Sequence, residues 1–323
     1  MLTGFVWDKK ELKIIESKDL MGYINKKNVN IWVNITDFAT DDTLILKEVF
    51  DIHPTTIEDI FSQQTRVKYE ESEDYTTTIF KGIEEVRENS VEIYNISFVM
   101  GGNFMISFVK EDKSEVIREL SKNNRKIENL LKRGKGYLVH YILDKEVDKF
   151  LRIKSDLGEE LKQIEREFRE NPDKELMTKI FLMELNFIEL RQLSESITDI
   201  CLSLTKPAEN YIKNDLIPYF KDVYDHALKT ADGYKSMLSR VNGMKNMYAT
   251  ITSMKTNEVM RSLTIIMALM MPLTIITGFY GMNVKLPLQE NLYAPLLIFL
   301  GMIFSAIVMI IISKKAGWIS KED

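Results

Sequence analysis

Cysteine is almost absent from this chain of 323 residues. The single Cys201 excludes a disulfide within the chain and fits a reducing cytoplasm. Its neighbours Ile200 and Leu202 are apolar, so we predict that Cys201 is a small core residue. The first residues, Met1–Asp8, do not have the pattern of a signal peptide. Any membrane insertion is therefore expected to depend on segments further along the chain.

Catalytic motifs are also lacking. The sequence has no Walker phosphate-binding loop, no phosphorylation motif and no catalytic-triad spacing, so we predict that the protein is not an enzyme. The net charge of −5 gives no indication of a nucleic-acid partner.

Charged residues are missing from two stretches near the C-terminus. None lies between Ser262 and Asn283, and none lies between Asn291 and Ser313. Runs of about 20 mostly apolar residues are long enough for a helix to cross a bilayer. A buried hairpin in a soluble core is the alternative, but core helices of this length normally keep a polar face. We therefore predict two membrane-spanning helices.

The basic residues orient this hairpin. They lie just before the first span and just after the second: Lys255, Arg261, Lys314 and Lys315. The loop between the spans has only Lys285 against Glu290. The positive-inside rule then places the loop outside and both termini in the cytoplasm. We predict a multi-pass protein of the inner, cytoplasmic membrane.

Proline is scarce as well, with seven in the chain. Between Pro218 and the loop the only proline is Pro272, so residues 219–279 are predicted to form one continuous helix. At 1.5 Å per residue it is about 90 Å long. Gly233 and Gly243 weaken this helix without ending it. Such a helix can transmit movement from a cytoplasmic domain to the membrane.

The preceding part of the chain mixes strand and helix patterns. Alternating apolar residues predict strands at 29–35, 94–99 and 104–109, the last two joined in a hairpin by Met100–Asn103. Residues 41–51 and 54–61 are predicted to be helical. After Ser114 the pattern stays helical, and residues 138–170 and 176–204 are predicted to form an antiparallel pair.

These patterns predict an α+β cytoplasmic domain followed by a long stalk helix and a transmembrane hairpin. The predicted segments are an N-terminal α/β domain at 1–135, a helix pair at 136–206, a stalk helix at 207–261, a pore-lining first span at 262–280, an extracellular loop at 281–291, a second span at 292–313 and a basic cytoplasmic tail at 314–323.

Two groups of residues with metal-ligand side chains are candidate cation sites. The first comprises His53, Glu58 and Asp59, for which a structural role at a turn is the favoured reading. The second is the acidic face of the first paired helix, where the favoured reading is a solvated face with partners such as Lys162 and Arg166: Glu159, Glu160, Glu165, Glu167 and Glu170.

The tetrapeptide Tyr280-Gly281-Met282-Asn283 ends the first predicted span, and a short loop and a second span follow it. With the segments 53–59, 219–226, 257–260 and 271–274, this arrangement resembles the CorA-type magnesium channels over nearly the whole chain. The loop departs from the family pattern because an acidic residue often found soon after the motif is missing from 284–289. Glu290 is the only acidic substitute.

The resemblance implies a symmetric homo-oligomer, a pentamer in the family, that conducts Mg²⁺ and related divalent ions such as Co²⁺ or Ni²⁺. It implies that Gly281, Met282 and Asn283 form a ring that selects hydrated Mg²⁺. These residue types suit the task, since Mg²⁺ dehydrates reluctantly and keeps its waters.

Two spans cannot enclose a pore, so several subunits must surround an axis. A 3.5-residue repeat along the first span gives a stripe of candidate pore-lining residues: Asn257, Met260, Leu263, Thr264, Met267, Met271, Thr274 and Gly278. Met260, Leu263 and Met271 are candidate apolar constrictions that gate by dewetting. The alternative is that the small and polar residues pack helices together.

The resemblance also implies regulation by Mg²⁺ bound between neighbouring cytoplasmic domains. Asp222 matches the family's acidic ligand, and Asp225 lies nearby. The partner carboxylate is assigned to Glu88, with Glu84 and Glu85 as alternatives after a strand that ends near Ile83. Asp222 can equally serve the N-terminal dipole of its helix.

Three functions therefore stand side by side. The leading one is a channel-like Mg²⁺ importer with no nucleic-acid partner. The second is a related transporter for Zn²⁺, Co²⁺ or Ni²⁺. The third is a membrane-anchored sensor or scaffold without ion flux.

Overall fold

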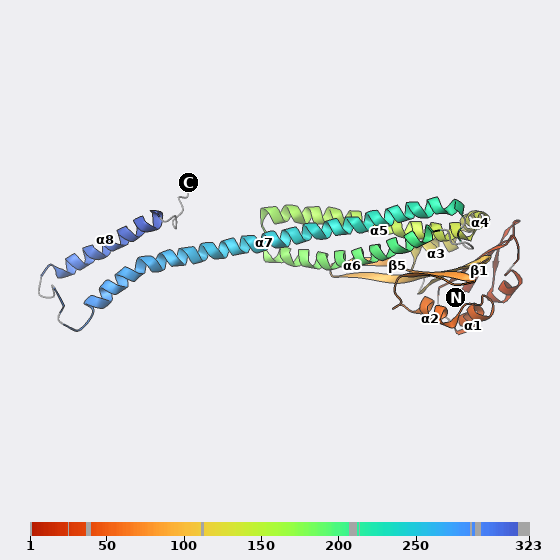
Figure 1. Ribbon diagram of the computed structural model, residues 1–323, viewed down its shortest axis with the longest axis horizontal. Coiled ribbons are helices and arrows are strands. Elements are labelled where there is room, and N and C mark those ends of the chain that lie inside the picture. The colour runs from red at the N-terminus through yellow and green to blue at the C-terminus, as the bar shows by residue number, and fades with distance from the viewer. Residues whose placement is uncertain are drawn as a thin grey trace. The chain divides into compact units, whose positions relative to one another are not determined.

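The computed structural model describes residues 2–24, 26–36, 40–110, 113–206, 212, 214–284, 286–287 and 292–315. The chain divides into two compact units, Met1–Met244 and Lys245–Asp323. Helix α7 (Ile217–Tyr280) contributes to both of them. Each unit is described by itself (Figure 1).

A seven-stranded mixed sheet organises the described part of the first unit. Its order is β2-β1-β3-β7-β6-β5-β4, and β3 and β7 run parallel while all other neighbours are antiparallel. The strands are β1 (Leu2–Trp7), β2 (Leu12–Ile15), β3 (Asn30–Ile35), β4 (Lys68–Glu71), β5 (Tyr75–Arg87), β6 (Ser90–Gly101) and β7 (Phe104–Val109). The three predicted strands and the predicted hairpin at Met100–Asn103 are confirmed.

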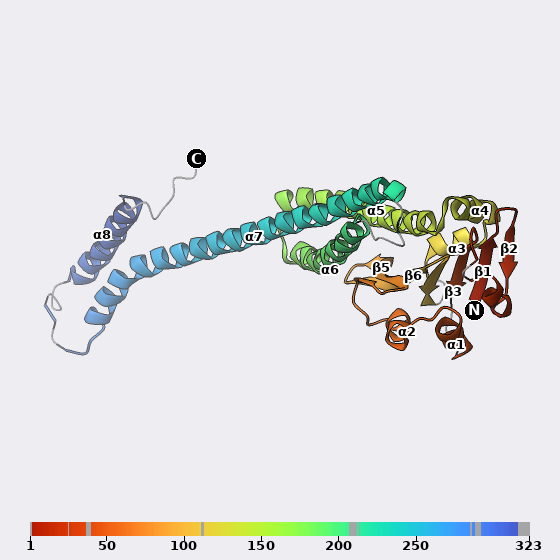
Figure 2. The same cartoon turned by 45° about the vertical axis from the view of Figure 1, so that its right-hand side comes forward.

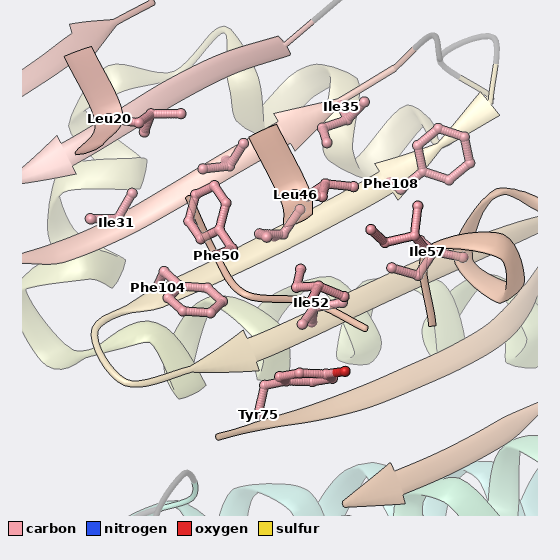
Figure 3. Packing of buried hydrophobic residues seen from close by; sticks show 14 of the residues in the cluster. Leu20, Ile31, Ile35, Leu46, Phe50, Ile52, Ile57, Tyr75, Phe104 and Phe108 are labelled. Carbon is pink, nitrogen blue, oxygen red and sulfur yellow. The ribbon is translucent and has the colours of Figure 1, made fainter. Parts of the chain in front are cut away.

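Two short helices cover one face of the sheet (Figure 2). They are α1 (Thr40–Glu48) and α2 (Pro54–Phe61), close to the predicted ranges. Leu46, Phe50 and Ile57 from this layer pack on Ile31 and on the other apolar side chains of the strands (Figure 3). Alternate residues of the central strands therefore supply this core, as a period of two requires.

His53 has the structural role that was favoured for it. Its backbone is extended, and its Nδ1 accepts a hydrogen bond from the Thr55 amide at 3.3 Å, which caps the start of α2. Pro54 follows at the first helical position, where its missing N–H costs nothing. Asp59 of the same helix pairs with Lys68 at 2.7 Å.

The opposite face of the sheet is covered by helices that follow in the chain. They are α3 (Glu115–Ser121), α4 (Asn124–Arg133), α5 (Lys135–Glu170) and α6 (Lys174–Leu204). The predicted antiparallel pair corresponds to α5 and α6, and the Asp173 side chain caps α6 where the break was predicted. Cys201 is fully buried, as predicted.

A buried carboxyl group joins this helical layer to the sheet. Glu146 of α5 is only 1% exposed. The Tyr94 hydroxyl of β6 donates to its Oε2 at 3.1 Å, and the Ser114 hydroxyl donates to its Oε1 at 2.6 Å. Burial raises the pKa of Glu146 above its ordinary value, although both hydrogen bonds act in the opposite direction.

The first part of α7 packs against the paired helices with one face. Its buried side chains include Phe220, Val223, Tyr234 and Val241. The N-terminal sheet and the pair α5–α6 belong to the same compact unit. The domain boundaries predicted at 135/136 and 206/207 therefore separate layers of one compact unit. Residues 207–211 and 213 lie outside the described part of the chain.

The second unit contains the two apolar helices. Helix α7 continues to Tyr280, and α8 runs over Ala294–Lys315. Their most apolar windows have mean hydropathies of 1.9 and 2.9, and 0% and 6% of those windows are buried. Both helices are long and apolar enough to cross a membrane. The single continuous helix predicted at 219–279 is confirmed, and the final turns of α8 end in Lys314 and Lys315.

Candidate functional site

The tripeptide Gly281-Met282-Asn283 lies immediately beyond the last turn of α7. The Gly281 amide donates to the Thr277 carbonyl at 2.9 Å, and the Met282 amide donates to the Phe279 carbonyl at 3.3 Å. These two bonds close the end of the helix. The side chains of Met282 and Asn283 are exposed, so the Asn283 amide is presented at the helix end.

Gly281 occupies a position with little room for a side chain. A Cβ atom there would lie 3.0 Å from the Thr277 carbonyl oxygen, which belongs to the backbone and cannot rotate away. At Gly278, one turn earlier, a Cβ atom would meet nothing within 4 Å. The two glycines therefore differ: a side chain at Gly281 would push the backbone by a few tenths of an ångström, whereas one at Gly278 would move nothing within the chain.

The eight predicted pore-lining residues all lie on α7. Their helical spacing places them on one stripe, as predicted, and the side chains of Met260, Leu263, Met267 and Met271 are about half exposed or more. The hydroxyls of Thr264 and Thr274 donate to carbonyls four residues earlier, at 2.8 and 2.9 Å. Each hydroxyl oxygen then keeps acceptor capacity toward water.

Pro272 lies inside α7 without ending it. Because proline has no amide hydrogen, the carbonyl of Ala268 has no donor four residues later. The structure thus confirms the position of this proline within an unbroken helix. Whether its free carbonyl takes part in conduction stays a prediction.

The predicted regulatory residues are exposed. Asp222 and Asp225 lie near the start of α7, and Glu88 lies in the turn between β5 and β6. The position predicted for Glu84 and Glu85 was wrong, because β5 does not end near Ile83 but continues to Arg87. A register shift between Ile83 and Glu85 accompanies this continuation.

Glu84 and Glu85 also have partners of their own. Lys113 lies 2.7 Å from Glu84, and Arg87 lies 3.0 Å from Glu85. Both carboxylates are therefore engaged within the chain. Of the three residues predicted to face Asp222 of a neighbouring subunit, Glu88 is the one that lies in the turn between β5 and β6.

The structure brings together a set of ligand-type side chains that the sequence did not single out. Among the described residues, the group that could hold a metal ion comprises Asp144, Asp148 and His226, with one ligand atom from each within 4.8 Å of the others. The first two are one turn apart on α5, and His226 lies on α7. The predicted regulatory residues Asp222, Asp225 and Glu88 are not members of this group.

The electrostatics of this cluster are mixed. Lys145 contacts the carboxylates of Asp148 and Asp144 at 2.7 and 3.3 Å, so part of their charge is already compensated. The Nδ1 atom of His226 is 3.9 Å from Asp148. Nearby, burial lowers the pKa of His140, while the carboxylates of Asp144 and Asp222 act to raise it. Asp144 and Asp222 therefore share one electrostatic neighbourhood.

The acidic face of α5 behaves as the favoured reading predicts. Glu159 pairs with Lys162 at 2.7 Å on the same helix. Glu165 pairs instead with Arg240 of α7, a partner 75 residues away that the sequence pattern did not indicate. Glu290 and Lys285 of the predicted loop lie outside the described residues, as does the tail from 316 onward.

Comparison with known proteins decides the family. The model of the family described as CorA-like Mg²⁺ transporter protein matches residues 27–315. The chain belongs to the CorA family. The matched region contains both apolar helices and the Gly-Met-Asn tripeptide between them.

Individual members of the CorA family agree with this assignment. The chain is 32% identical over 295 residues to the cobalt/magnesium transport protein CorA of Thermotoga maritima, covering 89% of this chain and 83% of that protein. It is 23% identical to the CorA of Methanocaldococcus jannaschii, over 90% and 91% of the two chains.

The fold is that of CorA over its full length. The complete structure of the CorA magnesium transporter from Methanocaldococcus jannaschii aligns with a TM-score of 0.80 and 21% identity, and covers 99% of both chains. Its soluble domain aligns separately with a TM-score of 0.62. The resemblance noted from the Gly-Met-Asn tripeptide and its position is confirmed.

Proposed function

We propose that this CorA-family protein is a homo-oligomeric channel, a pentamer, through which Mg²⁺ enters the cell down its electrochemical gradient. The observation that supports this most directly is the position of Gly281-Met282-Asn283 at the end of an uninterrupted apolar helix. The names of the relatives in Thermotoga maritima and Methanocaldococcus jannaschii point to the same cargo, and to Co²⁺ as a second one.

Selection is assigned to the ring that Asn283 forms around the axis of the oligomer. An amide oxygen is a neutral acceptor for the hydrogen atoms of water bound to Mg²⁺. Because Mg²⁺ loses its waters reluctantly, a ring that accepts hydrogen bonds from the hydrated ion avoids the cost of dehydration. Gly281 has no side chain, so the backbone turns tightly at the end of α7. This turn holds Asn283 at the helix end, where the ring of amides is proposed.

The path below the ring is mostly apolar. The half-exposed side chains of Met260, Leu263 and Met271 are placed at its constrictions, where they exclude water when the helices approach. Thr264 offers a hydroxyl oxygen between Leu263 and Met271, and Thr274 offers one between Met271 and the ring. An inside-negative potential of 100 mV favours entry of a divalent ion by about 4.6 kcal/mol.

Cytoplasmic Mg²⁺ is proposed to hold the channel closed by bridging two subunits. Asp222 and Asp225 of one protomer face Glu88 of its neighbour in this scheme, and all three are exposed. Carboxylate oxygens are the ligands that Mg²⁺ prefers, so these residues fit the ion. When the ion leaves, the acidic surfaces repel each other and α7 is free to shift.

The cluster Asp144–Asp148–His226 fits this role less well. Its imidazole is a ligand suited to Ni²⁺ or Zn²⁺ rather than Mg²⁺. Lys145 already occupies the two carboxylates. The regulatory site is therefore assigned to Asp222 and its neighbours.

The orientation follows from the basic residues. Lys314 and Lys315 at the end of α8 and Arg261 within α7 stay on the cytoplasmic side of the inner membrane, so that both termini are cytoplasmic. The tripeptide then faces the outside, where the ion arrives.

The proposal is tested with purified protein in liposomes that contain a Mg²⁺-sensitive dye and carry an inside-negative potential. With internal Mg²⁺ chelated, Mg²⁺ entry is expected, and preloading with millimolar Mg²⁺ is expected to suppress it. Parallel runs use Co²⁺, Ni²⁺ and Zn²⁺. Entry of Zn²⁺ alone would support the second transporter class, and no entry of any ion would support the sensor or scaffold.

A further inference from the structure

A cavity of about 470 Å³ lies in the first unit, where β1 ends and β3 and β7 begin. The pairing of the strands brings its walls together. In the antiparallel pair β1–β3, Trp7 stands opposite Asn30, and in the parallel pair β3–β7, Ile31 stands opposite Phe104. The turn after β1, the segment before β3, the β6–β7 turn and the end of α4 therefore meet there.

We call this cavity the basic pocket, because the described residues that line it include four lysines and no carboxylate. The residues that matter to the argument are Lys9, Lys26, Lys27, Asn28, Asn103 and Lys132. Lysine ammonium groups that line one cavity repel one another, and an anion bound between them relieves this repulsion.

Two carboxylates next to the pocket in the sequence form salt bridges, one of them with a lysine of the pocket. Asp8 pairs with Lys13 at 2.9 Å, and Glu128 pairs with Lys132 at 2.7 Å. Lys9, Lys26 and Lys27 form no salt bridge with the described residues. Glu128 thus compensates Lys132, and the uncompensated positive charge of the pocket comes from Lys9, Lys26 and Lys27, of which Lys26 also lies 4.9 Å from the ring centroid of Tyr23.

The backbone at the pocket is held in an uncommon conformation. Lys9 has φ 72° and Asn28 has φ 70°, and the one other non-glycine residue with positive φ in the described ranges is Asp51. Asparagine tolerates this region, but for lysine it is strained and glycine would be preferred. Strain of this kind is common where a side chain is needed at a binding site.

Hydrogen bonds fix the loops that form the walls. Asn103 donates from Nδ2 to the Tyr23 carbonyl at 3.0 Å, and its own carbonyl accepts from the Ile31 amide at 2.9 Å. Asn30 donates from Nδ2 to the Leu131 carbonyl at 2.8 Å. The segments before β3, after β6 and at the end of α4 are tied together without a ligand, so the pocket is preformed.

We propose that the basic pocket binds a small soluble anion that carries two or more phosphates, such as a nucleoside di- or triphosphate. Several ammonium groups with no carboxylate call for more than one negative charge, and lysine is a common partner of phosphate. The volume lies within the range of small-molecule sites, roughly 300–1,000 Å³, and exceeds what one phosphate requires. Trp7 is only 7% exposed, so its ring is not available for a nucleobase to stack on. We therefore expect the phosphate charge, and not the base, to determine which anion binds.

The test is calorimetric titration of the full-length protein in detergent with tripolyphosphate and with ATP. A chelator keeps Mg²⁺ absent, so that each probe carries its full charge. Saturable binding of both probes is expected, with sulfate binding much more weakly. No saturable binding of either probe at millimolar concentration would overturn the proposal.

Variants locate the site. Lys26→Ala combined with Lys27→Ala is expected to weaken tripolyphosphate binding by at least about tenfold, the effect of losing charged hydrogen bonds. Lys162→Ala removes an equally exposed lysine from α5 and is expected to change nothing. Equal losses in both variants would mean that the anion binds the surface unspecifically, against the proposal.

Lys9→Gly separates binding from folding. It removes the strain at φ 72°, so thermal stability is expected to be unchanged or higher while tripolyphosphate binds about tenfold more weakly. Unchanged binding would contradict a role for Lys9.

A competition test in lipid nanodiscs distinguishes a soluble anion from a lipid headgroup. Tripolyphosphate is expected to bind equally with and without cardiolipin. Loss of binding in the presence of cardiolipin would assign the pocket to lipid headgroups instead.

Discussion

Arg240 of α7 and Glu165 of α5 form a bidentate salt bridge. Arg240 donates from Nε to Oε1 and from Nη2 to Oε2, both at 2.7 Å. Arg240 lies four residues before Met244, the last residue of the first unit. It therefore fixes α7 to the paired helices at the end of their contact, and it lowers the pKa of Glu165.

Breaking this pair should destabilise the first unit. Arg240→Met is expected to lower the free energy of unfolding by about 1 kcal/mol, the value of a well-formed but partly exposed pair. The check is thermal unfolding in detergent. Lys162→Met, which breaks the exposed Lys162–Glu159 pair, is the control and is expected to change the stability much less.

The cost of Arg240→Met should also depend on pH. Because the folded-state pKa of Glu165 is lowered, the pair stabilises the protein above the ordinary pKa of glutamate and loses that effect as the pH falls through the lowered value. The difference between Arg240→Met and wild type should therefore shrink toward pH 3. A difference that is constant from pH 7 to pH 3 would assign the effect to packing.

Glu146 should give the opposite pH dependence. Its folded-state pKa is raised by burial, so its contribution to stability is full below the unfolded value near 4.5 and is lost as the pH rises through the raised value. Glu146→Gln keeps the shape, a donor and an acceptor without the charge. We expect it to melt at least as high as wild type at pH 7 and to flatten the profile above pH 4.5. A much lower melting temperature at pH 7 would show that the charged form is needed.

The two glycines at the end of α7 should respond differently to alanine. Gly281→Ala places Cβ against the Thr277 carbonyl and is expected to lower Mg²⁺ entry several-fold by shifting the turn that carries Asn283. Gly278→Ala has free space within the chain and is the matched control. Equal loss in both variants would mean that contacts between subunits, rather than the turn, limit this region.

Asp222 should be needed for closure and not for conduction. Asp222→Asn is expected to leave Mg²⁺ entry unchanged when internal Mg²⁺ is chelated and to increase it when internal Mg²⁺ is high. Asp232→Asn changes the same charge at another exposed position of α7 and is expected to behave as wild type. If Asp222→Asn stays as closed as wild type at high internal Mg²⁺, the regulatory site lies elsewhere.

The elements that the sequence predicted well carry their own local pattern. The β6–β7 hairpin combines alternating apolar residues with Gly101 and Gly102 in the turn, and α7 lacks any interior proline but Pro272. Strand β4 was missed because Lys68–Glu71 is a short, polar edge strand with no buried face to impose alternation. Strand β1 was missed because Gly4 interrupts its apolar pattern.

The rest depends on contacts between distant parts of the chain. The parallel pairing of β3 with β7 follows from a crossover of about 70 residues, and no local pattern specifies it. The approach of His226 to Asp144 and Asp148 requires the register of α7 on α5, as does the pairing of Arg240 with Glu165. The tripeptide at 281–283, in contrast, was predictable because both its residues and its place after a span are read directly from the sequence.

The central claim is that Asn283 selects hydrated Mg²⁺ in a conducting oligomer. The measurement that tests it is the initial rate of Mg²⁺ entry into liposomes under an inside-negative potential, comparing wild type, Asn283→Ala and the control Asn242→Ala at an exposed position of α7. The account predicts that wild type and Asn242→Ala conduct while Asn283→Ala loses most of its Mg²⁺ entry, although it remains folded and oligomeric. Undiminished Mg²⁺ entry through Asn283→Ala would contradict the account and would place selection elsewhere along α7.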